Sequence, residues 1–313
     1  MRSERTARAQ LDEILVSRQI VMVTGKGGVG KSIVSAALAL RARELGLRPL
    51  LFELDAPPRT SLLPDGKPAG DDVEELAPGI LGINQRSEDA IRDYAISTLP
   101  SRTVAELLFE NRVSKLFLRA SPSVSEMALV GRVAILAEKH GADGPVIVDL
   151  HATGHALSLV QAPAGIMKVL RGGVLHERAR RIEEILSDPQ RTAFITVALP
   201  EELPVTELLE LRARLRELRA PLGPVVLNGV IDDPAPLVAD EVVAHLETGA
   251  LKHAAHDLRA LRTWARRAAR ESERLKAALA QEGTELLTLP FIHDELKPGA
   301  LAGLLAARLG GAS

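Results

Sequence analysis

Hydrophobic positions along the chain fall into two patterns that follow one another repeatedly. Short apolar runs rich in Val, Ile and Leu predict strands that are buried on both faces of a sheet. Between these runs, apolar residues recur at three- and four-residue intervals, which predicts helices. Because strands alternate with helices, we expect an α/β fold with a mostly parallel sheet flanked by helices. The predicted strands are residues 20–24, 48–54, 80–83, 145–149, 192–199, 224–227 and 285–289.

The helical stretches show how the chain is organised. A leading helix carries Leu11, Ile14 and Leu15 and is expected to cover the sheet edge. The acidic, turn-rich residues 60–79 are interpreted as a surface excursion. We predict one domain over residues 1–313, with a helical insertion at about 86–141 and a second helical segment at about 232–282. The other predicted helices are residues 33–45, 163–186, 206–219 and 299–309.

A glycine-rich loop joins the first predicted strand to the next helix, in the sequence IVMVTGKGGVGKS at residues 20–32. The spacing G-x-x-x-x-G-K-S between a strand and a helix is typical of a phosphate-binding P-loop, which directs backbone amides at a triphosphate. We expect Lys31 to contact the β- and γ-phosphates of ATP and Ser32 to hold Mg²⁺. The predicted ATP contacts of this loop are Gly25, Lys26, Gly27, Gly28, Val29, Gly30, Lys31, Ser32 and Ile33.

Carboxylates follow two other predicted strands, at the edge where ligands of open α/β sheets bind. Asp55 could polarise the attacking water or coordinate Mg²⁺, and Glu53 competes for that role; alternatively, Asp55 only begins a turn before Pro57. Asp149 ends an apolar run, the pattern of a carboxylate that a buried strand delivers to the metal.

The segment after Asp149 adds further candidates. Gly154 would let the backbone approach the γ-phosphate, and the Thr153 hydroxyl would add a donor. His151 and His155 could be metal ligands at i, i+4, but without a third ligand we favour hydrogen bonds that stabilise the loop.

Composition limits the partners and the compartment. The 313 residues carry a net charge of −2 and no cysteine, which excludes disulfides and thiolate metal sites and is typical of a cytoplasmic protein. No apolar run approaches the ~20 residues of a membrane span.

A row of arginines at i+4 spacing has two possible roles. It either contacts DNA or is a solvated face with Asp257, Glu271 and Glu273; we favour the solvated face and expect no nucleic-acid partner. The arginines are Arg262, Arg266, Arg270 and Arg274.

Lys26, directly after the first glycine, makes GKGGVGKS resemble the deviant Walker A loop of dimeric ATPases that sort, pump or position cargo. In that group the extra lysine reaches the partner's phosphates across the interface. The resemblance implies a homodimer or a heterodimer with a paralogous ATPase, with two ATP molecules between the subunits. The alternative is that Lys26 is a solvated loop lysine.

Other motifs make the resemblance more specific. Together with the loop and Asp55, DLHATGHALSLVQAP at residues 149–163 resembles the ArsA-like family, which comprises arsenite-pump and tail-anchored-protein-targeting ATPases. Similarity continues in SPSVSEMALVGRV (121–133), VALPEELPVTELLEL (197–211) and VVLNGV (225–230). The resemblance implies hydrolysis of ATP to ADP and phosphate, with Lys26, Lys31 and Asp55 as catalytic residues. It also implies that Asn228 bonds adenine and that Pro290 and Phe291 cover the base.

Departures from the family pattern concern the cargo. The first switch, residues 55–59, keeps only the aspartate, and the absence of cysteine removes the family's metalloid and zinc sites. Only Met127 and Met167 fall where a methionine-rich client groove is expected. We therefore predict an ATP-hydrolysing switch coupled to targeting or transport of a protein or membrane partner. The alternatives are a chromosome-partitioning or cell-positioning ATPase and a non-hydrolysing ATP-binding module.

Overall fold

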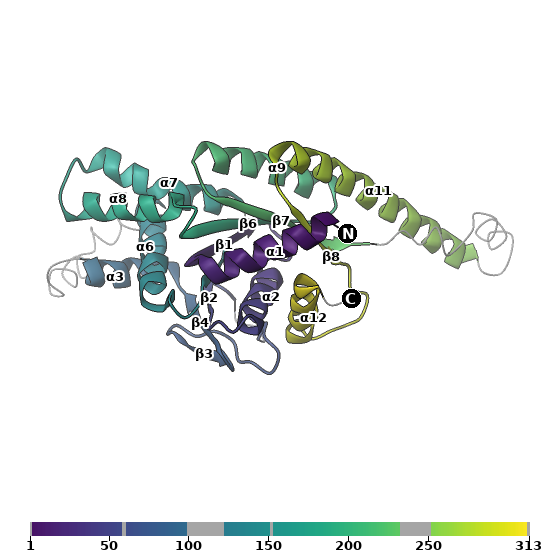
Figure 1. Cartoon of the computed structure of the whole chain (residues 1–313), viewed down its shortest axis with the longest axis horizontal. Coiled ribbons are helices and arrows are strands. Elements are labelled where there is room, and N and C mark those ends of the chain that lie inside the picture. Colours follow the sequence, from purple (N-terminus) through teal and green to yellow (C-terminus); the bar gives the residue numbers. More distant parts are fainter. Residues whose placement is uncertain (1, 58–60, 99–121, 151–152, 232–251, 312–313) are drawn as a thin grey trace.

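The computed structural model describes residues 2–57, 61–98, 122–150, 153–231 and 252–311 (Figure 1). Several predicted features fall partly outside these ranges. They are the end of the first switch, the middle of the helical insertion, His151, and the start of the second helical segment.

Eight strands form one sheet, in the order β3-β4-β2-β5-β1-β6-β7-β8. Among these strands, every neighbouring pair is parallel except β3 and β4. The α/β fold predicted from the alternation of strands and helices is thus confirmed. The strands are β1 (Ile20–Gly25), β2 (Leu50–Leu54), β3 (Glu74–Ala77), β4 (Ile80–Gln85), β5 (Val146–Asp149), β6 (Thr192–Ala198), β7 (Leu222–Val230) and β8 (Leu286–Pro290).

The edge strand β3 was not expected, because EELA lacks an apolar run. It pairs antiparallel with β4 after a tight turn, in which Gly79 adopts φ +78°. Part of the predicted surface excursion at residues 60–79 therefore belongs to the sheet. Leu76 and Ala77 are buried, which explains why this segment folds back.

The helices are α1 (Arg2–Ser17), α2 (Lys31–Glu44), α3 (Ser87–Thr98), α6 (Pro122–His140), α7 (Thr153–Val169), α8 (Val174–Ser187), α9 (Glu202–Glu217), α11 (Lys252–Glu282) and α12 (Pro298–Gly310). The single helix predicted at 163–186 is wrong. α7 starts at Thr153 and carries Pro163 in its interior, and the break comes at Gly172 and Gly173, where Gly173 has φ +91°. Thr153 and Gly154 thus open α7 instead of lying in a loop.

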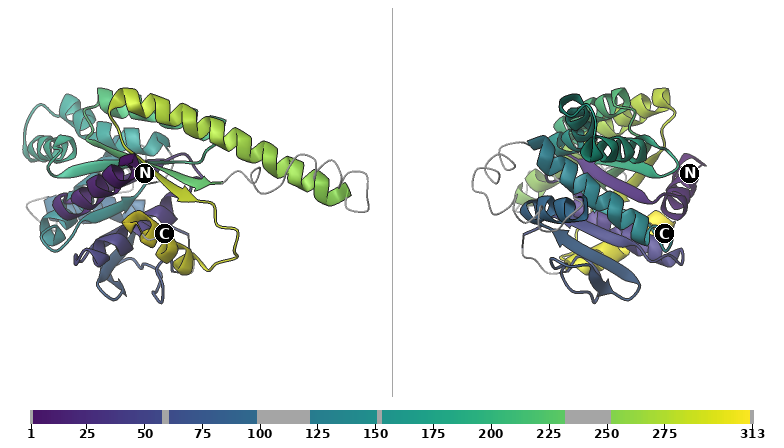
Figure 2. Two further views of the ribbon diagram at one scale, coloured as in Figure 1. Left: turned by 45° about the vertical axis from the view of Figure 1, so that its right-hand side comes forward. Right: turned by 90° about the vertical axis from the view of Figure 1, so that its left-hand side faces the viewer.

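Alternating side chains of the central strand face two separate apolar layers. Ile20 and Met22 pack in the layer that contains α6, α7 and α8, whereas Val21 and Val23 pack in the layer of α1, α2 and α12. Helices therefore cover both faces of the sheet (Figure 2). α1 packs on β7 and β8, which places Leu11 and Leu15 in the core near one edge, as predicted.

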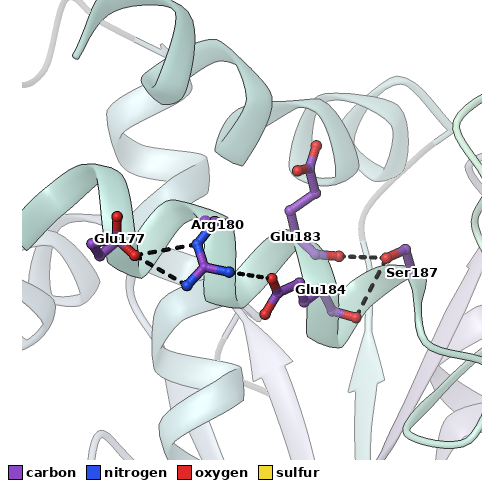
Figure 3. Close-up of polar contacts among 5 residues, drawn as sticks. All are labelled: Glu177, Arg180, Glu183, Glu184 and Ser187. Atoms are coloured by element: carbon purple, nitrogen blue, oxygen red, sulfur yellow. Dashed lines mark hydrogen bonds and ion pairs between the residues drawn. The ribbon is translucent and has the colours of Figure 1, made fainter. Parts of the chain in front are cut away.

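Arg180 of α8 is paired with two glutamates of the same helix. Arg180 Nη1 donates to Glu184 Oε1 at 2.6 Å, and its Nη2 donates to Glu177 Oε2 at 3.1 Å (Figure 3). Ser187 Oγ donates to the carbonyl oxygen of Glu183 at 2.8 Å (Figure 3). These i, i+3 and i, i+4 contacts stabilise α8 locally between Glu177 and Ser187.

The long helix α11 extends beyond the sheet (Figures 1 and 2). Its C-terminal part is anchored by Leu275 and Leu279, which pack with Val205 and Leu208 of α9. The four arginines predicted as one stripe differ in environment, because Arg262 is only 8% exposed while the other three face solvent. No helix in the described ranges has both the length and the apolar content needed to cross a bilayer.

Candidate nucleotide site

The glycine-rich loop connects the end of β1 to the start of α2, at the carboxyl edge of the sheet. A Cβ at Gly25 would collide with the carbonyl oxygen of Val197, and one at Gly30, where φ is +90°, would collide with the side chain of Asn228. By contrast, a Cβ at Gly27 or Gly28 would have no described atom within 4 Å. The loop is therefore packed on its inner side and open on its outer side, where a ligand could approach the backbone.

Lys31 begins α2 and is only 9% exposed. Its Nζ donates to the carbonyl oxygen of Lys26 at 2.9 Å, which holds the side chain along the loop. Burial lowers the pKa of Lys31, and the negative charge of Asp149 partly opposes that shift. A poorly solvated ammonium at a helix N-terminus is well suited to bind a phosphate.

Lys26 forms an ion pair within its own chain. Its Nζ lies 2.9 Å from Oε1 of Glu207 on α9, and the two side chains are 29% and 32% exposed. In this structure the lysine predicted to act on a second subunit is therefore held by α9.

Carboxylates gather where the central strands end. β5 lies between β2 and β1, so Asp149 is registered with Glu53 on one side and Val23 on the other. Glu53 is buried, whereas Asp149 is half-buried and acts electrostatically on Lys31. Ser32 lies in the first turn of α2, and hydroxyl and carboxylate oxygens are the ligands that Mg²⁺ prefers. Within the described ranges, no three His, Cys, Asp or Glu side chains are grouped closely enough to hold a metal by themselves.

Asp55 lies directly after β2 at φ +41°, and its side chain is exposed. Its carboxylate accepts a hydrogen bond from the backbone N–H of Ser87 at 2.9 Å and another from the Ser87 hydroxyl. Asp55 therefore caps the start of α3. Asp55 thus has the predicted role in a turn and also lies at the carboxyl edge of the sheet. Each of its carboxylate oxygens keeps lone pairs that can accept a further hydrogen bond.

The residues predicted for the base lie together on the other side of the loop. The Asn228 amide donates to the carbonyl oxygen of Val29 at 3.0 Å. Pro290 ends β8, and the N–H of Phe291 donates to the carbonyl oxygen of Val230 at 2.8 Å. β7 runs two residues past Asn228, so this asparagine is not strand-terminal as expected, but its side chain still contacts the P-loop.

Two contacts of the site were missed from the sequence. Glu207 belongs to the motif VALPEELPVTELLEL, but no pattern linked it to Lys26, which is 181 residues away. Ser87 carried no signal either, because its bond to Asp55 depends on how β2 and α3 meet.

The fold and this loop define the class of the protein as a P-loop nucleotide-binding protein with a parallel sheet. The family described as anion-transporting ATPase, ArsA, matches residues 18–176 and 173–241. The chain belongs to this family, as its motifs indicated.

Curated proteins similar to this chain are also named as ATPases. ATPase BagA of Mycobacterium tuberculosis is 27% identical over 311 residues, covering 90% of this chain and 89% of that protein. The arsenical pump-driving ATPase of Escherichia coli is 27% identical over 250 residues, covering 75% of this chain and 40% of that protein. ATPase ARSA1 of Chlamydomonas reinhardtii is 23% identical over 279 residues, covering 68% of this chain and 35% of that protein.

Proposed function

We propose that this chain is a Mg²⁺-dependent ATPase that hydrolyses ATP to ADP and phosphate as a dimer. The observation that carries the proposal is the buried Lys31 at the start of α2, which bonds the backbone of the glycine loop, interacts electrostatically with Asp149, and follows a loop that is open at Gly27 and Gly28. Family membership supports it.

Each residue has a role in this proposal. Lys31 and the loop amides bind the phosphates, and Ser32, Asp149 and Asp55 hold Mg²⁺ directly or through water. When bound, the ion neutralises charge on the phosphate oxygens. Asp55 orients the attacking water. Thr153, Gly154, Asn228, Pro290 and Phe291 complete the nucleotide contacts.

The pair between Lys26 and Glu207 supports a switch between two states. A partly exposed ion pair contributes only about 0.2–1 kcal/mol, so the lysine can exchange Glu207 for a triphosphate at little cost. We propose that ATP-bound subunits pair and that each Lys26 then acts on the phosphates of the other subunit. ATP turnover in the cytoplasm would drive targeting or transport of a protein or membrane partner.

Steady-state phosphate release tests the proposal. We expect hydrolysis by the wild type that EDTA abolishes. Lys26→Ala and Asp55→Asn should each reduce turnover by about 100-fold or more, while Asp55→Asn still binds ATP. Lys67→Ala, which changes an exposed lysine outside the site, should behave as wild type.

The same measurements distinguish an ATP-hydrolysing switch from a non-hydrolysing ATP-binding module. Normal turnover by Asp55→Asn would remove the water-orienting role. ATP binding without turnover in the wild type would establish the non-hydrolysing module instead. Because the chain has no cysteine, we expect arsenite to leave the rate unchanged, and stimulation by arsenite would contradict this proposal for the cargo.

A further inference from the structure

Three aromatic side chains cluster where α11 meets the end of β8. Trp264 of α11 packs edge-on against Phe291, with ring centroids 5.5 Å apart and an interplanar angle of 83°. His293 packs edge-on against the same phenyl ring at 4.9 Å. Phe291 is therefore held by two rings, one from a distant helix and one from its own loop.

The phenyl ring is contiguous with the nucleotide loop. Gly229 adopts φ +69°, and a Cβ there would lie 3.9 Å from Cδ2 of Phe291 and 3.2 Å from Cδ2 of Leu199. The preceding residue, Asn228, is the one whose amide contacts Val29 in the P-loop. Phe291, Gly229 and Asn228 thus form a continuous wall beside the P-loop.

Trp264 contacts that wall through Phe291. It lines a cleft of about 640 Å³ together with Pro200 and Glu201 before α9 and Arg267 and Arg270 of α11. Trp264 and Phe291 are 38% and 41% exposed, so Phe291 keeps accessible surface although Trp264 and His293 both contact its ring.

A second contact joins α11 to the site. Arg274 Nη2 donates to Thr206 Oγ1 at 3.1 Å, and Thr206 precedes the Glu207 that holds Lys26. α11 therefore contacts the base side of the loop through Trp264 and approaches its phosphate side through Arg274.

We infer that Trp264 is a positioning residue for the nucleotide base, which it affects by holding Phe291 against the Asn228–Gly229 wall. This inference rests on the proposed binding of ATP. Because the contact lies on the base side, removing it weakens binding of the nucleoside and leaves the chemistry at the γ-phosphate unchanged.

Kinetics with two ligands test the inference. We expect Trp264→Ala to raise KM for ATP about three- to tenfold with little change in kcat, the scale of a lost aromatic pair. Inhibition by inorganic triphosphate, which has no base, should stay as in the wild type. Trp264→Phe keeps an aromatic edge and should restore most of the KM. Arg266→Ala, an exposed change on the same helix, is the matched control.

Trp264 is the only tryptophan in the chain, so its fluorescence gives a readout independent of turnover. ATP and ADP should shift the emission, whereas inorganic triphosphate should not. Suppose that calorimetry shows nucleotide binding, but nucleotide does not shift the Trp264 emission and Trp264→Ala does not change KM. This inference is then wrong and the proposed function stands. An equal loss of affinity for ATP and triphosphate in both Trp264 variants would also overturn it. If no nucleotide binds, the proposed function fails first.

Discussion

At the residue scale, the charged groups of the candidate site have unusual surroundings. Lys31 is charged yet poorly solvated, and Asp55 caps α3 while lying at the carboxyl edge of the sheet. Glu126 in α6 is a further charged group whose surroundings disfavour its charge. Burial raises the pKa of Glu126, and a hydrogen bond with Ser158 of α7 partly opposes the shift.

Glu126→Gln should stabilise the protein at high pH. Because the folded-state pKa of Glu126 lies above its usual value of 4.5, its favourable contribution is present at low pH and is lost as pH rises through the folded-state pKa. Glutamine keeps a neutral side chain at every pH. Calorimetric melting should show a Tm above wild type at pH 8 and a difference that shrinks toward pH 4.

Glu138→Gln is the control, since Glu138 is exposed on the same helix and pairs with Arg181. Glu138→Gln should show no increase in Tm over wild type at pH 8. A Tm difference for Glu126→Gln that does not vary with pH would contradict the assignment.

Elements are joined on one side of the sheet by a buried cation. Arg212 of α9 is fully buried and donates to Glu282 at the end of α11, to Thr284, to Thr196 of β6 and to the carbonyl oxygen of Gly223. Burial lowers the pKa of Arg212, and the charge of Glu282 opposes this shift. α9, which also holds Lys26, is therefore fixed to the sheet and to α11 by one side chain.

Arg212→Ala should lower the free energy of unfolding by about 3–5 kcal/mol, because it leaves a cavity and several buried acceptors without their donor. Urea unfolding followed by circular dichroism measures this loss. Arg214→Ala, an exposed change on the same helix, should stay within about 0.5 kcal/mol of wild type. A loss below about 1 kcal/mol for Arg212→Ala would show that the network contributes little.

At the scale of the whole molecule, the open side of the loop and the held Lys26 belong to one state of the proposed switch. In that proposed switch, Glu207 would compete with the second subunit for Lys26. Its removal should therefore favour the dimer.

Glu207→Gln should dimerise with ATP at a concentration about two- to fivefold lower than wild type, the scale of a partly exposed ion pair. Sedimentation velocity, starting from the 33.5-kDa chain, measures this shift. Glu210→Gln, exposed on the same helix, is the control. A protein that stays monomeric with ATP at high concentration would contradict the dimeric mechanism, although nucleotide binding would survive.

Much of the fold and the core of the candidate site could be predicted, because their signals are local. A glycine loop between a strand and a helix, and carboxylates at strand ends, depend on spacing over a few residues and on the backbone freedom of glycine. The parallel sheet followed from alternation alone. Family membership followed from the same motifs.

The remaining features were decided by tertiary structure, because they are contacts between segments far apart in the chain. β3 formed because its neighbours bury Leu76 and Ala77, although its own sequence lacks a strand pattern. Pro163 lies inside α7 without ending it, so the helix continues past a residue that usually breaks helices, and the break comes only at Gly172 and Gly173. The pairing of Lys26 with Glu207 and of Trp264 with Phe291 has no local signal, since each joins elements that only folding brings together.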